Sequence, residues 1–262
     1  MRVLVAGFQH ETNTFAPSLA DWDAFNSGEV FPAFSQAAGF AAVECHFPYD
    51  QPIEEVQQAL TETGLPMLGL NTIKGNTGGL AAQPDQIAAA RQSIQEAVTY
   101  GAAIGALNIH VMAGLGEGAR SLACFQDNLK YATDLAGASG MQIVIEPLNA
   151  HDVPGYFLKN TDQAIEIIES ISHKNLRLMF DCYHVGRTEG AVIERLQACW
   201  PWIGHIQFAG VPDRGVPDQG TLDYREVFAA IVAAGWDTPL GAEYRVKGST
   251  EDSLGWMQAL AL

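Results

Sequence analysis

Eight short runs of apolar and β-branched residues recur along the chain and constrain its fold more than any other feature. In chain order, these runs are Arg2–Phe8, Ala42–Cys45, Pro66–Asn71, Ala106–Met112, Gln142–Glu146, Leu176–Asp181, Ile203–Phe208 and Pro239–Glu243. Between them lie segments with helical apolar periodicity, which include Gln83–Gly101, Ser121–Ala138, Thr161–Ile171, Glu189–Ala198 and Tyr224–Ala234. Strand and helix therefore alternate, which predicts an α/β protein with a parallel sheet.

An open doubly wound sheet and a closed barrel both give this alternation, and the length of the chain and its loops distinguish them. An open doubly wound sheet would carry a phosphate loop after a strand, but neither GxGxxG nor GxxxxGK[ST] occurs, and the Gly-rich segment 75–79 lacks the Lys. A closed barrel of eight units takes about 250 residues, and the chain has 262. We therefore expect one (β/α)8 TIM barrel over residues 1–262, with residues 1–32 as an atypical segment that supplies the first strand and loop. Within it, 19–32 fits either the first helix or a long loop.

Capping residues mark several helix boundaries. Helix starts are expected at Pro84 with Asp85, at Thr161 and at Asp223. Helix ends that need a left-handed residue are expected at Gly64, Gly140 and Gly235.

The chain is acidic, with 14 basic and 30 acidic residues and a formal net charge of −16. Such a surface repels the DNA backbone and anionic lipid headgroups, so we expect neither nucleic acid nor membrane as a partner. The four cysteines lack CxxC or Cys/His metal spacing, as expected of thiols in a reducing cytosol. Without a long apolar run or a signal-like segment, the chain is expected to be cytoplasmic. The sequence leaves open whether the chain forms a homo-oligomer.

Four of the later runs end in acidic or amide side chains, namely Glu146, Asp181, Gln207 and Glu243. In a barrel, the C-terminal ends of the strands share one mouth, so these residues are expected to become neighbours. Unpaired carboxylates held so close would raise one another's pKa, whereas a divalent cation neutralises them. Carboxylate and amide oxygens favour Mg²⁺ or Mn²⁺, and nearby histidines leave Co²⁺ or Zn²⁺ open. The pattern predicts a metal site.

Two histidines lie close to these strand ends. His184 follows Asp181 by three residues and could polarise a substrate oxygen. His205 precedes Gln207 by two residues, so strand alternation aims both side chains to the same side.

Three more residues are candidates for substrate binding. Arg214 could hold an anionic substrate carboxylate through its planar fork. His110 ends the fourth run and could reach the same mouth, while Asn149 follows the fifth run and could orient the site. Each of them could equally be an ordinary loop or ion-pair residue.

At these residues the chain resembles the hydroxypyruvate isomerase family, within the sugar-isomerase and epimerase barrels related to xylose isomerase. The likeness covers about residues 33–262, through AAVECHFPYD, LNTIKG, LNIHVMAGL, IVIEPLN with DVPGYFL, MFDCYH, IGHIQFAGVPDR and GAEYR with TEDSLGW. It implies metal ligands at Glu146, Asp181, Gln207 and Glu243, with the two glutamates as the acid/base pair. Related tagatose and psicose epimerases usually carry His where this chain has Gln207, which favours the isomerase branch.

Two loops depart from the family pattern. Gly186 and Thr188 stand where the family usually shows Gln and Met, and Ala191 stands where Asp is common. After Arg214, the usual HEPGTGE pattern reads GVPDQGT over 215–221. These loops border the substrate, so they leave its identity open while the metal ligands stay in place.

The first residues carry a different resemblance. Residues 1–15, extending toward 31, resemble the opening of the microcystin-degrading (MlrC-like) amidohydrolase family, although nothing else of that family is evident. We interpret this segment as the first barrel strand and its loop, with His10 and Glu11 as loop residues.

The leading functional hypothesis is an aldose-ketose type isomerase that converts hydroxypyruvate to tartronate semialdehyde through a cis-enediol. A metal would hold the adjacent oxygens while one glutamate removes the carbon-bound proton and the other returns it. Which glutamate starts protonated stays open, as does a hydride shift.

Other functions compete with this hypothesis. The substrate could be a 2-oxo-tetronate, or the chain could be a related ketose 3-epimerase. The altered loops also fit a catalytically degenerate barrel that binds a sugar acid. An endonuclease of the same barrel superfamily is disfavoured by the charge of −16 and by fewer histidines than a three-zinc site needs.

Overall fold

The computed structural model describes residues 5–6, 39–246 and 251–260. Within these residues, eight parallel strands form one sheet in the order β2-β1-β8-β7-β6-β5-β4-β3. The strands are β1 (Val5–Ala6), β2 (Ala42–Val43), β3 (Gly69–Asn71), β4 (Asn108–His110), β5 (Gln142–Ile145), β6 (Leu176–Asp181), β7 (Ile203–Phe208) and β8 (Gly241–Ala242). All eight lie inside the predicted runs.

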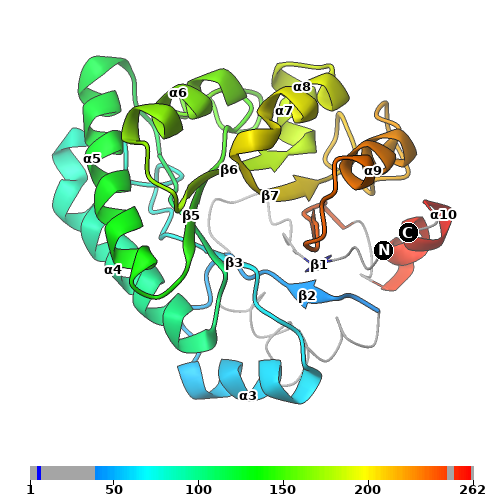
Figure 1. Cartoon of the computed structure of the whole chain (residues 1–262), viewed down its shortest axis with the longest axis horizontal. Helices are drawn as coiled ribbons and strands as arrows, with labels where there is room; N and C mark the ends of the chain where they lie inside the picture. The colour runs from blue at the N-terminus through cyan, green and yellow to red at the C-terminus, as the bar shows by residue number, and fades with distance from the viewer. Residues whose placement is uncertain (1–4, 7–38, 247–250, 261–262) are drawn as a thin grey trace.

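Contacts between β2 and the segment before β3 close the sheet into a barrel. Val43 forms a parallel bridge with Met67. Its N–H donates to the carbonyl of Pro66 at 3.0 Å, and its carbonyl accepts from the N–H of Leu68 at 2.8 Å. The predicted (β/α)8 barrel is confirmed, and Figure 1 shows the strands at its centre.

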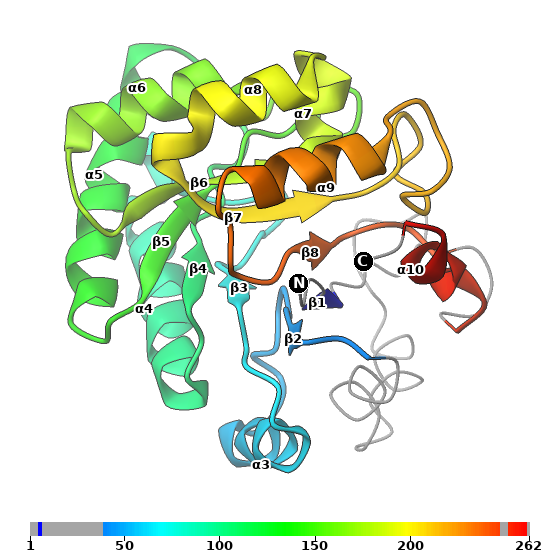
Figure 2. The same cartoon turned by 45° about the vertical axis from the view of Figure 1, so that its right-hand side comes forward.

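Helices cover the outside of the barrel (Figures 1 and 2). They are α3 (Ile53–Thr63), α4 (Ile87–Ile104), α5 (Gly118–Gly137), α6 (Thr161–Ile171), α7 (Cys182–Thr188), α8 (Val192–Cys199), α9 (Tyr224–Ala233) and α10 (Trp256–Ala259), with short 3-10 helices at η1 (Pro84–Gln86), η2 (Trp200–Trp202) and η3 (Glu251–Gly255). Among the described residues, no helix has the length and apolar character needed to cross a membrane.

Helix α6 illustrates how these helices attach to the barrel. Asn160 caps its start by accepting a hydrogen bond from the N–H of Gln163 at 2.9 Å. Ala164, Ile167 and Ile168 recur at helical spacing and are buried, and the helix packs on β6. Each buried Ile side chain contributes about 1.5–3 kcal/mol through removal of apolar area from water.

Most of the predicted boundaries hold. The three glycines expected after helices all have positive φ, at 67° for Gly64, 74° for Gly140 and 85° for Gly235. Asp223 caps α9 by accepting from the N–H of Arg225, as predicted. The cap of α6 is Asn160, one residue before the predicted Thr161, because the asparagine side chain reaches the open backbone N–H groups.

The expected helix between β6 and β7 is divided into two helices. The segment Glu189–Ala198 was expected to be one helix, which is wrong: α7 ends at Thr188 with Glu189 as its C-cap, and α8 begins at Val192. The turn through Gly190 and Ala191, both with positive φ, separates the two helices. The atypical N-terminal segment lies outside the described residues, apart from β1.

Candidate metal centre

The four predicted strand-end residues lie at the C-terminal ends of neighbouring strands. Glu146 directly follows β5, Asp181 ends β6, Gln207 lies near the end of β7 and Glu243 directly follows β8. Asp181 and Gln207 are paired in register across β6 and β7. None of the four side chains is more than 5% exposed, so together they bring three buried carboxyl groups and one buried amide to the barrel mouth.

The tightest potential ligand group at this mouth consists of Glu146, Asp181 and His184. One ligand atom from each residue lies within 4.8 Å of the other two. His184 Nε2 is 3.8 Å from Glu146 Oε1 and 3.7 Å from Asp181 Oδ2. His184, predicted beside the site, therefore lies directly against its carboxylates.

Burial and mutual repulsion disfavour the charged forms of these acids. Burial raises the pKa of Glu146 well above its usual value, and the charges of Glu243 and Asp181 raise it further. Burial also raises the pKa of Asp181 to about 7, although Arg214 lowers it in part. This is the electrostatic conflict that the sequence predicted for clustered strand-end acids.

The ligand atoms of this cluster have the character that a divalent cation requires. Glu146 Oε1, Asp181 Oδ2 and Gln207 Oε1 are buried and have no hydrogen-bond partner among the described residues. A buried polar atom left without a partner costs about 1–3 kcal/mol, more when charged, which a hard cation would offset through oxygen coordination. The residues therefore fit a divalent metal with oxygen ligands.

Asn149 fixes which nitrogen of His184 carries the proton. His184 Nδ1 accepts from the backbone N–H of Asn149 at 3.0 Å, and Asn149 Nδ2 lies 2.8 Å from the same nitrogen. The amide is oriented in turn because Asn149 Oδ1 accepts from the N–H groups of His151 and Asp152. Burial lowers the pKa of His184 well below its usual value, so the ring is neutral. Its proton then sits on Nε2, which makes His184 a hydrogen-bond donor at the mouth rather than a metal ligand.

Arg214 is tied to one of the predicted acids. Its Nη2 donates to Glu243 Oε1 at 2.6 Å, and its Nε donates to the backbone carbonyl of the same residue at 3.3 Å. The guanidinium lies 5.3 Å from the ring centre of Tyr183, and the residue adopts φ of 58°. Arg214 thus forms an ion pair, the alternative that the sequence left open, although the pair is buried at the mouth; its contact with a substrate stays a prediction.

Two further histidines border the same acids. His110 Nδ1 lies 3.6 Å from Glu146 Oε2, and burial lowers the pKa of His110 to about 3. His46 Nε2 lies 3.6 Å from Glu243 Oε1. His110 was predicted to reach the mouth and does so. His46, which directly follows the second run, was not among the predicted site residues.

Glu44 is the other residue that sequence analysis missed. It follows β2 directly, is buried, and accepts from Gln207 Nε2 through Oε2 at 2.8 Å. Its Oε1 contacts His205 Nε2. Burial raises the pKa of Glu44, but the contacts with His205 and Gln207 outweigh it and leave the pKa below its usual value. His205 and Gln207 thus share one partner, in agreement with their predicted common side.

Comparison with known proteins shows the family to which the chain belongs. A family model described as the xylose isomerase-like TIM barrel matches residues 32–260. The chain belongs to this family. It is 39% identical to 2-oxo-tetronate isomerase of Cupriavidus necator, over 89% of this chain and 94% of that protein. It is 31% identical to hydroxypyruvate isomerase of Escherichia coli, with the same coverage of both chains. The family resemblance noted from the sequence is confirmed.

A solved structure gives the same picture of the fold. The structure of AP endonuclease, family 2, from Brucella melitensis superimposes on this xylose isomerase-like barrel with a TM-score of 0.86. The two chains are 27% identical, and the likeness covers 99% of each.

In this xylose isomerase-like barrel, steric contact and backbone conformation restrict two of the positions that depart from the family pattern, Gly186 and Ala191. A Cβ at Gly186 would lie 3.0 Å from Val211 Cγ2, so α7 approaches the loop after β7 closely. Ala191 has φ of 43°, a conformation that Asp adopts more readily than Ala. The departure at Ala191 therefore introduces backbone strain between α7 and α8.

Proposed function

We propose that the chain is a metal-assisted isomerase of a small hydroxy-keto acid, with hydroxypyruvate as the leading substrate and tartronate semialdehyde as the product. Glu146, Asp181, Gln207 and Glu243 would hold the cation, with Mg²⁺ or Mn²⁺ favoured and Co²⁺ or Zn²⁺ open. The observation that carries the proposal is the set of buried, unpartnered oxygens at the mouth, among the residues that the structure describes. The isomerase names of the relatives support the same reaction class.

The cation would supply a Lewis acid that polarises the substrate carbonyl and stabilises negative charge on neighbouring oxygens. In the proposed cis-enediol route, one glutamate removes a proton from the hydroxymethyl carbon, the hydroxyl proton passes to the neighbouring former carbonyl oxygen, and the other glutamate gives a proton to the adjacent carbon. Arg214 occupies Glu243 Oε1, which leaves Oε2 of that carboxylate to take up the proton. We therefore assign proton removal to Glu243 and proton return to Glu146.

The neighbouring residues would bind and orient the substrate. His184, held by Asn149 with its proton on Nε2, would donate a hydrogen bond to a substrate oxygen. His110 is neutral beside Glu146 and would face the same oxygens. Arg214 would hold the substrate carboxylate, and its ion pair with Glu243 would link substrate binding to the base.

The second candidate substrate is 2-oxo-tetronate, which has one more carbon. Two relatives that carry this name, from Cupriavidus necator and Pectobacterium atrosepticum, are 39% and 34% identical to the chain. The altered loop over 215–221 borders the mouth after β7 and could change the space for a fourth carbon.

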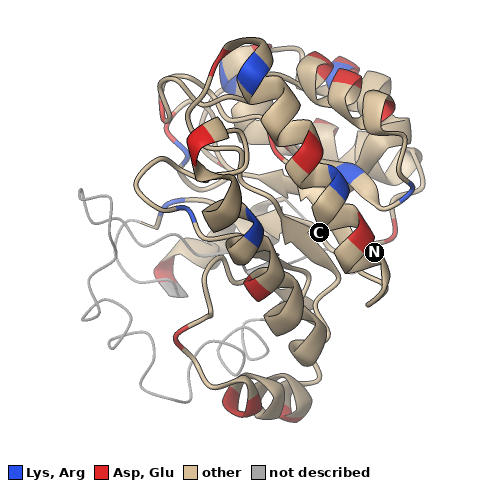
Figure 3. Cartoon of the chain, turned by 90° about the vertical axis from the view of Figure 1, so that its left-hand side faces the viewer, with Lys and Arg blue, Asp and Glu red and all other residues tan. Residues whose placement is uncertain are grey.

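Two functions of other classes remain as rivals. A degenerate sugar-acid-binding barrel would keep the metal site without turnover. An endonuclease is disfavoured by the net charge of −16. Figure 3 shows acidic positions spread over the helices of one face, with fewer basic ones between them.

We propose a cytoplasmic location, in line with four free thiols, and leave the oligomeric state open.

A reconstitution assay tests the proposed function. The purified chain is stripped of metal, loaded with Mg²⁺ or Mn²⁺, and assayed on hydroxypyruvate and on 2-oxo-tetronate, with Asp181→Asn as the matched inactive variant. Metal-dependent turnover of either acid supports the isomerase, and the ratio of kcat/KM values ranks the two substrates. Tight metal binding without turnover of any small hydroxy-keto acid would instead favour the binding protein.

A further inference from the structure

Glu44 directly follows β2 and contacts two residues of β7, which lies three positions away from β2 in the sheet. In the strand order, β1 and β8 separate β2 from β7. Both oxygens of the Glu44 carboxylate are nevertheless engaged by β7, one by Gln207 Nε2 at 2.8 Å and the other by His205 Nε2. All three side chains are buried. Glu44 therefore reaches across the barrel interior.

The contact with Glu44 determines which end of the Gln207 amide faces the site. A side-chain amide can turn over and present either its oxygen or its NH₂ group to a given neighbour. A carboxylate without a proton can only accept hydrogen bonds, so it selects the NH₂ group of Gln207. The opposite atom, Oε1, is then directed away from Glu44, and it is buried without a partner among the described residues.

Gly241 provides the space for this contact. It lies on β8 and is paired in register with Gln207. A Cβ at this position would lie 2.7 Å from Gln207 Cγ and 2.7 Å from Glu44 Oε1, both closer than normal contact. A glycine is thus required for the carboxylate and the amide to meet beside β8.

We propose that Glu44 is a positioning residue for the metal centre. By accepting from Gln207 Nε2, it holds the amide so that Oε1 is presented as a metal ligand, and it increases the electron density on that oxygen through the hydrogen bond to its NH₂ group. His205 fixes the other Glu44 oxygen and so prevents the carboxylate from rotating away. This inference rests on the metal site of the proposed function and adds a residue that touches neither metal nor substrate.

The test is the Mn²⁺ affinity of the full chain, measured by titration with detection of free Mn²⁺ by electron paramagnetic resonance. Glu44→Met keeps the side-chain length but removes both acceptors. We expect its dissociation constant for Mn²⁺ to rise about 10- to 100-fold, the usual effect of losing a residue that orients a ligand. Circular dichroism confirms that the variant is folded.

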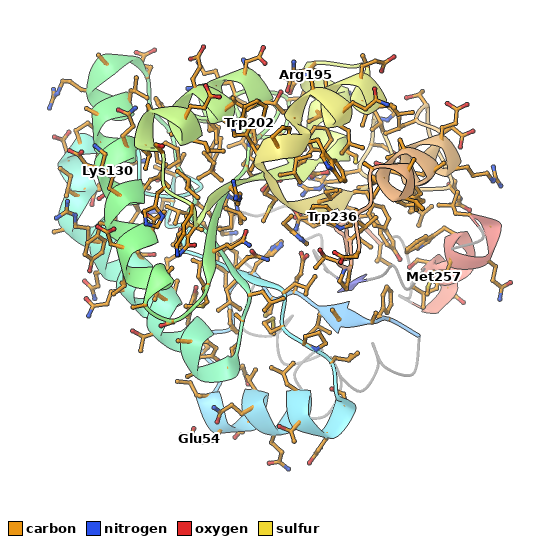
Figure 4. All side chains as sticks on the ribbon, viewed as in Figure 1. Glu54, Lys130, Arg195, Trp202, Trp236 and Met257 are labelled. Carbon is orange, nitrogen blue, oxygen red and sulfur yellow. The ribbon has the colours of Figure 1, made fainter. Side chains whose placement is uncertain are left out.

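Glu189→Gln is the matched control. Glu189 also accepts hydrogen bonds through a largely buried carboxylate, from Thr161, and faces Arg195. Figure 4 labels Arg195 in the outer helical layer, away from the barrel centre. This variant is expected to lose thermal stability and to keep its Mn²⁺ affinity within about 2-fold, since the substitution leaves the residues that orient the metal ligands untouched.

A double variant separates positioning from a general structural role. In Glu44→Gln/Gln207→Glu, the hydrogen bond reverses: the new amide donates to the new carboxylate, whose other oxygen faces the site. We expect Mn²⁺ affinity to return to within about 3-fold of the original chain, or to exceed it, because carboxylate oxygen is a strong ligand for a hard cation. A role limited to stability would give no such recovery.

The possible outcomes are distinct. If Glu44→Met does not fold, Gly241→Ala replaces it, and the Cβ is expected to displace the amide and weaken Mn²⁺ binding. Unchanged Mn²⁺ affinity in a folded Glu44→Met or Gly241→Ala chain would overturn the positioning role while leaving the metal site intact. If the unsubstituted chain itself binds no Mn²⁺, both the metal site and this inference are wrong.

Discussion

Two clusters of acidic side chains in this barrel use their carboxylates in opposite ways. In the outer cluster, between α6 and α8, Glu189 Oε1 accepts from the N–H of Thr161 at 3.0 Å, and Oε2 lies 3.1 Å from Arg195 Nε. In the mouth cluster, Glu146 Oε1 and Asp181 Oδ2 are buried without a hydrogen-bond partner among the described residues. The carboxylate of the outer cluster therefore has donors and a cation as partners, whereas the mouth cluster contains carboxylate oxygens without a partner in the described part of the chain.

This difference separates structural acids from functional ones. The outer carboxylate is matched by donors and a cation, so it ties two helices together. Burial, together with the charges of neighbouring acids, raises the pKa of Glu146 and Asp181 at the mouth, and a protein retains such a conflict where it serves binding or catalysis.

The largest expected effect is on catalysis at the mouth. Glu243→Gln and Glu146→Gln each remove a group proposed to transfer a proton, so kcat on hydroxypyruvate should fall at least about 1,000-fold. Glu146→Gln should keep the fold, because a neutral amide relieves the repulsion among the mouth acids. Glu243→Gln should lower the free energy of unfolding, because Arg214 loses its buried ionic partner. Steady-state kinetics with circular dichroism tests both statements, and an active Glu243→Gln enzyme would falsify the assignment.

The next effect is on the pH dependence of stability in metal-free protein. The pKa of Asp181 is raised to about 7 in the folded state from 3.8. The folded state therefore binds more protons than the unfolded state between these values, so the free energy of unfolding should fall as pH rises from about 4 to 7. The loss should be on the order of a few kcal/mol, measured by urea unfolding after metal removal.

Asp181→Asn is the control for that titration, since an asparagine can still accept the hydrogen bond from the N–H of Tyr183. The difference in unfolding free energy between this variant and the original chain should grow with pH through the same window. Saturating Mg²⁺ should abolish the trend in the original chain. A constant difference from pH 4 to 8 would show that Asp181 titrates as an ordinary acid.

A smaller effect is expected in the outer cluster. Glu189→Gln should lower the free energy of unfolding by about 1–3 kcal/mol, because Thr161 loses a charged acceptor and Arg195 keeps only Asp162 as an ionic partner among the described residues. Activity and metal affinity should not change. Chemical denaturation and the isomerase assay measure the two properties, and a drop in kcat above 10-fold would contradict the separation of the clusters.

The smallest effect concerns backbone strain. Ala191, beside the outer cluster, and Arg214, at the mouth, are both non-glycine residues with positive φ, at 43° and 58°. Ala191→Gly should raise the free energy of unfolding by about 1 kcal/mol without altering activity, because glycine adopts this conformation without steric cost. Thermal unfolding would detect it as a higher Tm, and an unchanged or lower Tm would show that the strain is negligible.

The sequence predicted the fold well because the barrel repeats one unit, and each strand lies within a run rich in apolar residues. The acids at Glu146 and Asp181 were predicted for the same reason, since each ends such a run. Glu44 was missed because the second run continues through Cys45, so its glutamate looked like an inner strand residue. In the structure β2 ends at Val43, which places Glu44 at the mouth.

Other features depend on distances that local patterns do not contain. Helix α7 has only seven residues, too few to show helical periodicity, and its cap is Asp181, itself a predicted ligand. Asp181 Oδ1 accepts from the N–H of Tyr183, while Oδ2 faces the site. The pairing of Arg214 with Glu243 joins two segments that only the closed barrel brings together.

The central claim is that the mouth carboxylates, and not the outer ones, hold a divalent cation. Titration of the metal-stripped chain with Mn²⁺ tests it directly, in parallel with Asp181→Asn and Glu189→Gln. We expect one saturable site per chain that is lost in Asp181→Asn and retained in Glu189→Gln. Absence of saturable binding in the original chain, or equal binding in Asp181→Asn, would contradict it.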